Sequence, residues 1–499
     1  MYNYGVSAAD ARRPEPVREV ETKFDIAPDF VLPALDQLGH QINVDTVALH
    51  STYWDTPAGD LLRYRLTLRR RVGDADSGWQ LKLPGSGFRT ELHWPLTDGA
   101  GDQPPAAMTE LLAPFLQGST AAPAVRLEVT RTRHRVVDAA GELLIEIAED
   151  DVRAAPLSAE VRAPRWHEVE AELGPAGDHD LLAAAERALH QAGAYPSTSR
   201  AKLSRALLGI GNEGVGTPHA SAGAVLANYI SQQCDALVAG YFAVVADAPD
   251  SVHRTRVATR RIRSTLRTFD RCFSPEAAAA LDIELKWYAE VLGEVRDREV
   301  LRERIAAAIA DLPPELIVGS APDNIDARLA AEQAERRAEL LEAMQTHRYW
   351  DLLTAVTGCR DDPPFTAAAG RPARTLTEAL QRAERRLDRR LDRAAAPTST
   401  DEELHSARKQ GKRVRYAAEA ALAGPSRAAR RARQLQELLG EFQDNVVAEQ
   451  VLRRLAADAW SRGEDAFTYG VLAAEAHSRA HQLRAATRDP GGGGRTLRG

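Results

Sequence analysis

The chain changes its hydrophobic pattern once, at the Gly-rich segment GIGNEGVGTPHASAG that spans residues 209–223. Before this segment, short runs alternate apolar and polar residues and are separated by Gly, Pro and Asp, which is the pattern of β-strands. After it, up to about residue 487, the sequence is rich in Ala, Leu, Arg and Glu, which favour helices. The Gly-rich segment itself predicts a linker. We therefore expect a β-rich domain followed by an all-α domain.

The ends of the chain complete this division. The first residues, MYNYGVSAADARRPEP, lack the apolar segment of a signal peptide and predict a loose leader. The last residues, DPGGGGRTLRG, predict a flexible tail. The expected order is a leader at 1–14, a β domain at 15–210, a linker at 211–221, a helical domain at 222–487 and a tail at 488–499.

Composition limits the classes of protein that fit. An apolar share of 44% is ordinary, so both domains can bury cores. The formal net charge of −7 gives no support for a nucleic-acid partner, and any basic surface must be local. No apolar run is long enough to cross a bilayer. The cysteines Cys234, Cys272 and Cys359 lie far apart, which argues against a thiolate metal site and a disulfide framework. We expect a soluble cytoplasmic protein without a membrane partner.

Each strand candidate of the β domain has one strongly charged face. In REVETKF, at residues 18–24, the charged residues Glu19, Glu21 and Lys23 alternate with less polar ones. Helices are expected at 28–40 and 179–192, where they can cover the apolar faces. The eight strand candidates lie at 17–24, 45–55, 61–72, 77–84, 88–96, 124–137, 142–152 and 165–173.

The charges are segregated by strand, with acids on the first and last strands and arginines on the middle ones. A charged face is commonly just the solvated side of a sheet. If the sheet closes with these faces inside, the charged interior is costly unless a charged ligand fills it. Clustered Arg and Lys require a polyanion, and clustered carboxylates suit Mg²⁺ or Mn²⁺. A divalent cation together with a phosphate chain would satisfy both groups.

At this point the sequence resembles the CYTH family, the triphosphate tunnel metalloenzymes. EVETKF matches the family's ExExK signature, and the resemblance extends over about residues 15–210. It includes, in order, TYWDTP, LTLRRR, LKLPG, FRTEL, EVEAEL and AKLSRAL. The resemblance implies an eight-stranded antiparallel β tunnel with flanking helices and a metal-dependent hydrolase of inorganic triphosphate. Arg65 stands where many members have Gly, and it would alter how the tunnel mouth fits a substrate.

The resemblance also implies roles for residues that match its motifs. Lys23 and Asp150 would act in catalysis, with Asp150 near the attacking water. The cofactor would be Mg²⁺ or Mn²⁺, held by Glu19, Glu21, Glu170 and Glu172. The oxygens of the triphosphate would contact Lys23, Arg69, Arg71, Lys82, Arg131, Arg133 and Lys202. For Arg89 and Glu91, a structural cross-strand ion pair is as good an interpretation as a functional role.

The helical half contains a repeat. HRTRVATRRIR from His253 and HSARKQGKRVR from His405 share the pattern H-x-x-R-x-x-x-[RK]-[RK]-x-R. Each is followed by a second match, LGEVRDREVL from Leu292 and LGEFQDNVVA from Leu439. Two such units suggest an internal duplication, which predicts two helical bundles related by an approximate twofold axis.

Helical spacing places the basic residues of each copy on one stripe. The segment 253–267 contains no acid, and an unpaired basic stripe attracts an anion. Alternatively, acids from a neighbouring helix pair with these residues, and the histidines pack between helices or, less favourably, bind a metal. Lys286, Arg296, Asp297 and Asp444 could complete or support the surface. The stripe residues are His253, Arg256, Arg260, Arg263 and Arg267 in the first copy and His405, Arg408, Lys409, Lys412 and Arg415 in the second.

This half is similar to the CHAD family, the conserved histidine α-helical domain, over about residues 222–487. The resemblance implies binding of inorganic polyphosphate to the two stripes. We expect a triphosphatase tethered to a polyphosphate-binding domain, because tethering raises the local substrate concentration. Two alternatives stay open: a non-catalytic polyphosphate-binding or scaffold protein, and a CYTH enzyme of the adenylate cyclase or thiamine triphosphatase type.

Overall fold

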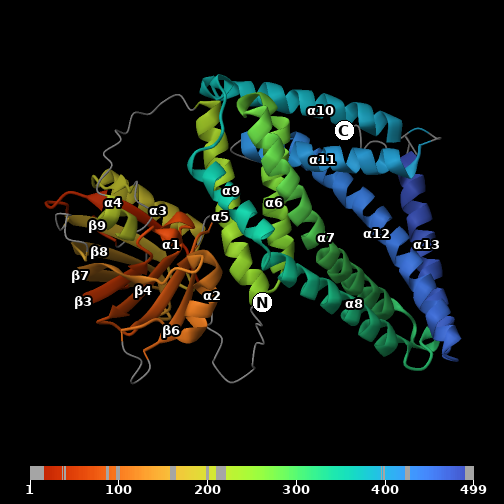
Figure 1. Cartoon of the computed structure of the whole chain (residues 1–499), viewed down its shortest axis with the longest axis horizontal. Helices are drawn as coiled ribbons and strands as arrows, with labels where there is room; N and C mark the ends of the chain where they lie inside the picture. Colours follow the sequence, from red (N-terminus) through yellow and green to blue (C-terminus); the bar gives the residue numbers. More distant parts are fainter. Residues whose placement is uncertain are drawn as a thin grey trace. The chain divides into compact units, whose positions relative to one another are not determined.

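The computed structural model divides the chain into two compact units, Met1–Val215 and Gly216–Gly499 (Figure 1). The predicted leader, residues 211–220 of the predicted linker and residues 489–499 of the predicted tail lie outside the described residues. Each unit is therefore treated by itself. The structure describes residues 16–35, 38, 41–85, 89–96, 102–157, 164–197, 202–208, 221–394, 396, 399–421 and 427–488.

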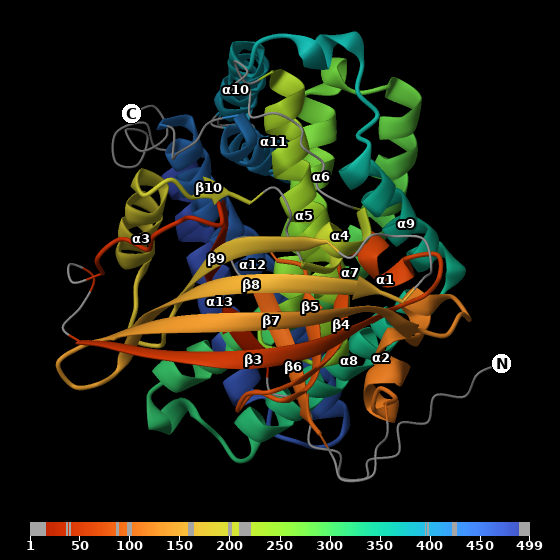
Figure 2. The ribbon, with the colours of Figure 1, turned by 90° about the vertical axis from the view of Figure 1, so that its left-hand side faces the viewer.

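The described strands of the first unit form one curled antiparallel sheet, of which Figure 2 shows β3, β7, β8 and β9 side by side. The order across the sheet is β1-β6-β5-β4-β3-β7-β8-β9-β2-β10. The strands are β1 (Pro16–Glu19), β2 (Glu21–Ile26), β3 (Gln41–Asp55), β4 (Thr67–Val72), β5 (Gly78–Leu83), β6 (Arg89–Pro95), β7 (Ala122–Val137), β8 (Leu143–Pro156), β9 (Arg165–Leu173) and β10 (Tyr195–Pro196).

The first predicted strand is divided at Val20, and its two parts pair with different neighbours. β1 pairs with β6, while β2 pairs with β9. The carbonyl of Val20 accepts a hydrogen bond from the backbone N–H of Leu173 at 3.0 Å. The segment thus joins the two sides of the curled sheet. This division, together with the short β10, explains why the sheet has ten strands among the described residues where eight were predicted.

Two predicted elements differ in part from the structure: residues 67–72 of the expected strand 61–72 do form β4, and residues 36, 37, 39 and 40 of the expected helix 28–40 lie outside the described residues. The first part of the expected strand 61–72 is the short helix α1 (Asp60–Arg63), because the Asp55 carboxylate accepts the N–H groups of Leu61 and Leu62 at its beginning. Residues 28–35 contain no helix, since Pro33 can neither donate a backbone hydrogen bond nor fit a helix interior. The helix α2 (Ala106–Leu116) was not predicted, whereas α3 (His179–Gln191) confirms the helix expected at 179–192.

Arg65 follows α1 in a left-handed conformation, with φ of 57°. Glycine adopts this conformation readily, whereas side chains with a Cβ do so at a cost. A family preference for Gly at this position therefore has a backbone reason. Neither Arg63 nor Arg65 continues the alternation of β4, so the two residues do not share the face of Arg69 and Arg71.

The sheet has an apolar face under α3 and a charged face opposite to it. On the apolar face, Phe24, Ile147 and Val169 pack with Leu182 and Leu189 of α3. The opposite face is charged over much of its length, as predicted. At one end it is apolar instead. There, the cluster of Val129, Val152 and Trp166 packs against Leu203 and Ala206 of α4 (Lys202–Leu208).

In the second unit, consecutive helices pack against one another from α5 to α9 and again from α10 to α13, and α6 also contacts α11 (Figure 1). The first copy of the repeat lies on α6 and α7, and the second lies on α11 and α12. The arrangement in two bundles stays a prediction. No helix among the described residues is both long enough and apolar enough to span a membrane. The helices are α5 (Ala222–Val245), α6 (Ser251–Thr268), α7 (Pro275–Asp311), α8 (Ala321–Met344), α9 (His347–Asp361), α10 (Arg374–Ala394), α11 (Asp401–Ala421), α12 (Arg427–Ser461) and α13 (Phe467–Arg488).

Candidate functional site

The strand registers bring acids and bases from distant parts of the chain onto the charged face. Lys23 lies opposite Glu170 in the β2–β9 pair, and its Nζ is 2.6 Å from Oε1 of that residue. Asp150 lies opposite Arg131 in the β7–β8 pair, and Arg131 binds its carboxylate with two hydrogen bonds of 2.8 and 2.7 Å. Alternation along each strand therefore builds the site that the sequence predicted for these four residues.

A buried trio of carboxylates lies at the centre of this face. Asp150, Glu168 and Glu170 offer oxygens within 4.8 Å of one another. The first residue of α4 reaches into the trio: Lys202 Nζ lies 3.0 Å from Asp150 and 2.7 Å from Glu170, and it also binds Glu168. Burial opposes ionisation of Asp150, but Arg131 and Lys202 outweigh it and hold the pKa of this carboxyl below its ordinary value. Asp150 and Glu170 are thus held ionised, and protein cations already pair with all three carboxylates of the trio.

A second group of carboxylates is less well neutralised. Glu21 lies opposite Glu172 in the β2–β9 pair, and Glu172 forms no hydrogen bond or ion pair within the described part of the chain. Burial first, and then the carboxylate of Glu19, raise the pKa of Glu172 to about 8. Glu19 itself binds Lys82 at 2.6 Å. A carboxyl group whose pKa is raised by neighbouring carboxylates is typical of a cluster of acids that binds a cation.

These two groups differ in how well they fit a divalent cation. In the trio, Lys202 already occupies the position that a cation would take. Beside Glu172, no protein cation among the described residues occupies the space between the carboxyl groups in an ion pair with it, and Glu19, Glu21 and Glu172 form an oxygen donor set that suits Mg²⁺ or Mn²⁺. The predicted ligands Glu19, Glu21 and Glu172 therefore fit the metal. Glu170 contacts Lys23, Arg131 and Lys202.

The arginines of β4 and the lysine of β5 line the same face. Arg69 donates to Gln80 at 2.5 Å and to the hydroxyl of Tyr53 at 3.4 Å. Lys82 binds Glu91 at 2.9 Å. Burial raises the pKa of Glu91, but Lys82 and Arg69 overcome this effect and hold it at about 2. Arg69 and Lys82 are thus placed together, as the sequence analysis expected of triphosphate ligands.

Two other predicted ligands have acidic partners that the sequence did not identify. Arg71 donates to Asp76 at 2.9 Å, and Arg133 binds both Asp45 and Asp74. Asp74 and Asp76 belong to the turn between β4 and β5, where they give no periodic signal in the sequence.

Three further members of the network were given no role by the sequence analysis. Glu168 shares a strand face with Glu170, which is a signal that could have identified it. For Arg89 and Glu91, a structural cross-strand ion pair and a functional role were both left open. Arg89 binds Glu21 at 3.2 Å, and Glu91 binds Lys82 across the β5–β6 pair. Both belong to the network that surrounds the predicted metal ligands.

In the helical unit, a neighbouring helix neutralises two of the five residues of the first basic stripe. Arg263 donates to Asp282 of α7 at 3.1 Å, and Arg267 binds the same carboxylate through two donors. Arg261, which flanks the stripe, binds Glu419 at 2.9 Å. For these residues the alternative reading applies, in which acids from another helix pair with the stripe.

Four of the remaining stripe residues form a basic cluster, which we define as Arg256, Arg260, Arg408 and Lys412. Arg256 is 3.3 Å from Asp297, whereas Arg260, Arg408 and Lys412 make no ion pair within the described residues. Burial, followed by Arg260, Arg408 and Arg256, lowers the pKa of Lys412 to about 6. Such a shift records repulsion between cations that lack a counter-charge. The cluster therefore favours an anion.

Two glycines of the repeated LGE motif make room for the cluster. A Cβ built on Gly293 of α7 would lie 3.0 Å from Nη2 of Arg256. At the equivalent position in α12, a Cβ on Gly440 would lie 3.9 Å from Nη2 of Arg408. The two arginines thus extend across corresponding glycines of the next helix. The contact is tight in the first copy and ordinary in the second.

The other predicted polyphosphate ligands are more dispersed. The side chain of His253 is largely exposed. Its partial burial, followed by the nearby positive charge of Arg296, lowers its pKa. His405 lies in α11, but its side chain is outside the described part of the structure. Lys409 is exposed. Arg415 is 3.6 Å from Glu419 and its guanidinium lies over the ring of Tyr416.

The residues expected to support the surface are distributed differently. Lys286 pairs with Glu290 and Arg296 with Glu299, each on its own helix. Asp297 contacts Arg256, and burial raises the pKa of Asp444.

Comparisons with known proteins agree with this division. A CYTH domain matches residues 17–206, and a CHAD domain matches residues 228–453. "Uncharacterized protein Rv2226" of Mycobacterium tuberculosis is 34% identical over 497 residues, which cover 95% of this chain and 96% of that protein. PptA from Streptomyces chartreusis has a TM-score of 0.46 at 21% identity, covering 56% of this chain and 100% of its own. The CHAD domain from the plant Ricinus communis has a TM-score of 0.44 at 24% identity, covering 53% and 90%.

Proposed function

The chain belongs to the proteins in which a CYTH domain is fused to a CHAD domain, and we propose that it hydrolyses inorganic triphosphate or a related short triphosphate compound and binds polyphosphate. The charged face of the sheet would be the hydrolytic site. The basic cluster on α6 and α11 would be the polyphosphate site. Each proposal is supported by charges that the described protein groups leave without a counter-charge.

Glu19, Glu21 and Glu172 would hold the divalent cation, with Glu170 nearby. A bound Mg²⁺ or Mn²⁺ would neutralise phosphate oxygens and lower the barrier to attack by water. Once these carboxylates bind a cation, they hold Lys82 and Lys23 less strongly. Those ammonium groups can then contact phosphate oxygens.

The arginines would hold the remaining phosphate oxygens in two-donor contacts. Arg69 lies on the charged face beside Lys82, and both side chains are largely withdrawn from solvent. Asp150 is ionised, but both of its oxygens accept hydrogen bonds from Arg131. Asp150 would therefore hold Arg131 and Lys202 in place. Its role as the residue near the attacking water, expected from the family resemblance, stays a prediction.

The observation that carries the hydrolytic proposal is the grouping of Glu19, Glu21 and Glu172, in which Glu172 has no ion-pair partner among the described residues. The raised pKa of Glu172, about 8 because of burial and the nearby carboxylates, agrees with this grouping. The experiment is release of phosphate from triphosphate, thiamine triphosphate, ATP and long-chain polyphosphate, with Mg²⁺ or Mn²⁺. Glu21→Ala should abolish metal-dependent release and keep the fold, judged by circular dichroism. The matched control is Glu128→Ala, since Glu128 is an exposed residue of β7 on the same sheet. Release at the parent rate in Glu21→Ala would refute the assignment.

One observation favours a second candidate function, binding without turnover. Lys202 and Arg131 neutralise the trio of Asp150, Glu168 and Glu170 completely enough to mimic a bound cation. A site of this kind could bind a phosphate chain and release nothing. Calorimetric titration with triphosphate, run beside the phosphate-release assay, separates the two functions. Binding without phosphate release in every metal condition would support the scaffold alternative.

The polyphosphate proposal rests on Arg260, Arg408 and Lys412. Long-chain polyphosphate should bind with steep salt dependence, because many cations exchange their counter-ions for phosphate; this rule is taken from nucleic acids. Charge reversal at Arg260 and Lys412 together should weaken binding strongly and leave triphosphate hydrolysis unchanged. Unchanged polyphosphate affinity at two salt concentrations would show that the cluster is a structural surface.

A further inference from the structure

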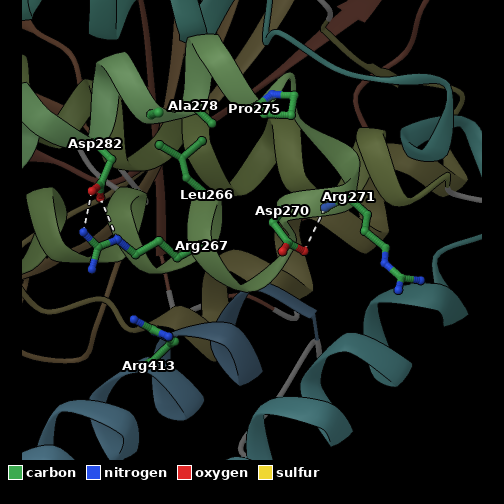
Figure 3. A pocket seen from close by; sticks show the side chains of 9 residues that line it. Leu266, Arg267, Asp270, Arg271, Pro275, Ala278, Asp282 and Arg413 are labelled. Carbon is green, nitrogen blue, oxygen red and sulfur yellow. Dashed lines mark hydrogen bonds and ion pairs between the residues drawn. The ribbon is translucent and has the colours of Figure 1, made fainter.

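The helical unit has a surface cavity of about 610 Å³ where α6 ends and α7 begins. A cavity of this size can hold a ligand as large as a nucleotide. Its lining combines apolar and cationic groups in separate places (Figure 3). Leu266, Pro275 and Ala278 supply apolar surface, and Arg267, Arg271 and Arg413 supply charge. Arg413 comes from α11, which is distant in sequence from Arg267 and Arg271.

The acids in the lining already have partners. Asp282 accepts hydrogen bonds from Arg267 (Figure 3). It also accepts one from Arg263. Asp270 accepts the backbone N–H of Arg271 at 2.9 Å, which leaves the guanidinium of that residue to the cavity. Neither acid therefore neutralises Arg271 or Arg413.

Two guanidinium groups are consequently available to a ligand. Those of Arg271 and Arg413 form no ion pair or hydrogen bond within the described ranges of the chain. In Figure 3, Arg413 extends from its helix towards Arg267, and Arg271 lies on the other side of the cavity. Burial and the nearby Arg267 and Arg390 lower the pKa of Arg413, which agrees with a cation that lacks a counter-charge.

We propose that this cavity is a second ligand site, which binds a small organic anion. Its phosphate or carboxylate group would contact Arg413 through the planar donors of the guanidinium, and Arg271 would be available to a second polar group of the ligand. Its apolar body would cover Pro275 and Ala278, removing their surface from water. This site goes beyond the proposed function, since none of Arg260, Arg408 or Lys412 lines it.

The apolar lining distinguishes the expected ligand from polyphosphate. An inorganic phosphate chain has no apolar part and gains nothing from Pro275 or Ala278. The neighbouring Arg263 and Arg267 are also paired with Asp282. A polyphosphate chain that extends from the basic cluster towards the cavity would therefore meet cations that already have a counter-charge.

The test is calorimetric titration of the full chain with adenosine monophosphate, adenosine, orthophosphate and benzoate. Adenosine monophosphate should bind more tightly than adenosine or orthophosphate by about tenfold or more, because each carries only one of the two required parts. Benzoate binding would extend the site to carboxylates, and its absence would restrict the site to phosphates. Arg413→Met should weaken adenosine monophosphate about tenfold.

Two further variants locate the binding. Ala279 lines the cavity and is exposed, so Ala279→Phe should fill the cavity and abolish binding without removing a charge. Arg328→Met, on α8, removes an exposed cation that does not line the cavity, and it should leave the affinity unchanged. The proposal is overturned if adenosine monophosphate fails to bind the parent chain. It is equally overturned if Arg413→Met and Ala279→Phe bind like the parent, or if only Arg260→Glu abolishes binding.

Discussion

Lys412→Met should make the unliganded chain more stable and its polyphosphate binding weaker. The parent lysine is surrounded by Arg256, Arg260 and Arg408, and burial together with their repulsion lowers its pKa from 10.5 to about 6. A methionine of similar length fills the same space without the charge. The two expected effects have opposite signs, so a general loss of structure cannot produce both.

The magnitude follows from proton linkage. Between pH 6 and 10.5 the unfolded chain holds a proton at Lys412 that the folded chain lacks, so the free energy of unfolding rises with pH in this window. At pH 7, the interval that remains up to pH 10.5 corresponds to a destabilisation of the folded parent by about 5 kcal/mol as an upper bound. Partial exposure and screening by salt reduce this to about 1–3 kcal/mol. The unfolding midpoint should rise by about 2–4 °C per kcal/mol.

The assay is thermal unfolding of the full chain at low and moderate salt, followed by titration with long-chain polyphosphate. The gain in stability should shrink as salt increases. Polyphosphate should also raise the pKa of Lys412, so the parent should take up protons on binding near pH 7 and the variant should take up fewer. Arg328→Met is the control for loss of an exposed charge. A lower midpoint in Lys412→Met, or unchanged polyphosphate affinity, would refute the reasoning.

Three more outcomes are expected. Gly293→Ala should raise stability by about 1 kcal/mol, since it removes a glycine from a helix interior, yet weaken polyphosphate binding by displacing Arg256. Gly440→Ala should raise stability in the same way but leave polyphosphate affinity unchanged. Equal polyphosphate affinities for Gly293→Ala and Gly440→Ala would contradict this difference. Between pH 4.5 and about 8 the folded parent holds a proton at Glu172 that the unfolded chain lacks, so in the presence of chelator its free energy of unfolding should fall as pH rises. Glu172→Gln should remove this fall. Urea unfolding at several pH values measures it, and the same dependence on pH in parent and variant would count against the prediction. Lys202→Met should destabilise the chain by about 3–5 kcal/mol, because it leaves buried carboxylates undercompensated, and a midpoint equal to that of the parent in urea would show that they are neutralised in another way.

The local features of the site could be predicted from the sequence because they repeat with the period of the backbone. Alternation in a strand fixes which side chains share a face, so Glu19, Glu21 and Lys23 could be grouped without a structure. Helical spacing likewise grouped Arg256 and Arg260. The matching copies at residues 253–263 and 405–415 indicated a duplication. These inferences need only the geometry of one element.

The sequence could not predict which charges are compensated. Asp282, which neutralises Arg263 and Arg267, belongs to another helix and carries no mark that assigns it to the stripe. Lys202 reaches the trio of carboxylates only because α4 packs on the charged face of the sheet. Such pairings depend on tertiary contacts between elements.

The sequence by itself therefore determined the two domain types, the charged strand faces and the two basic stripes, since periodicity is a property of the backbone. Only the tertiary structure decided where charge remains uncompensated. Glu172 lacks a cation, and Lys412 lacks an anion, because of the side chains that other elements place around them. The physical reason is that electrostatic energy depends on distance and burial in space, which the order of residues along the chain does not specify.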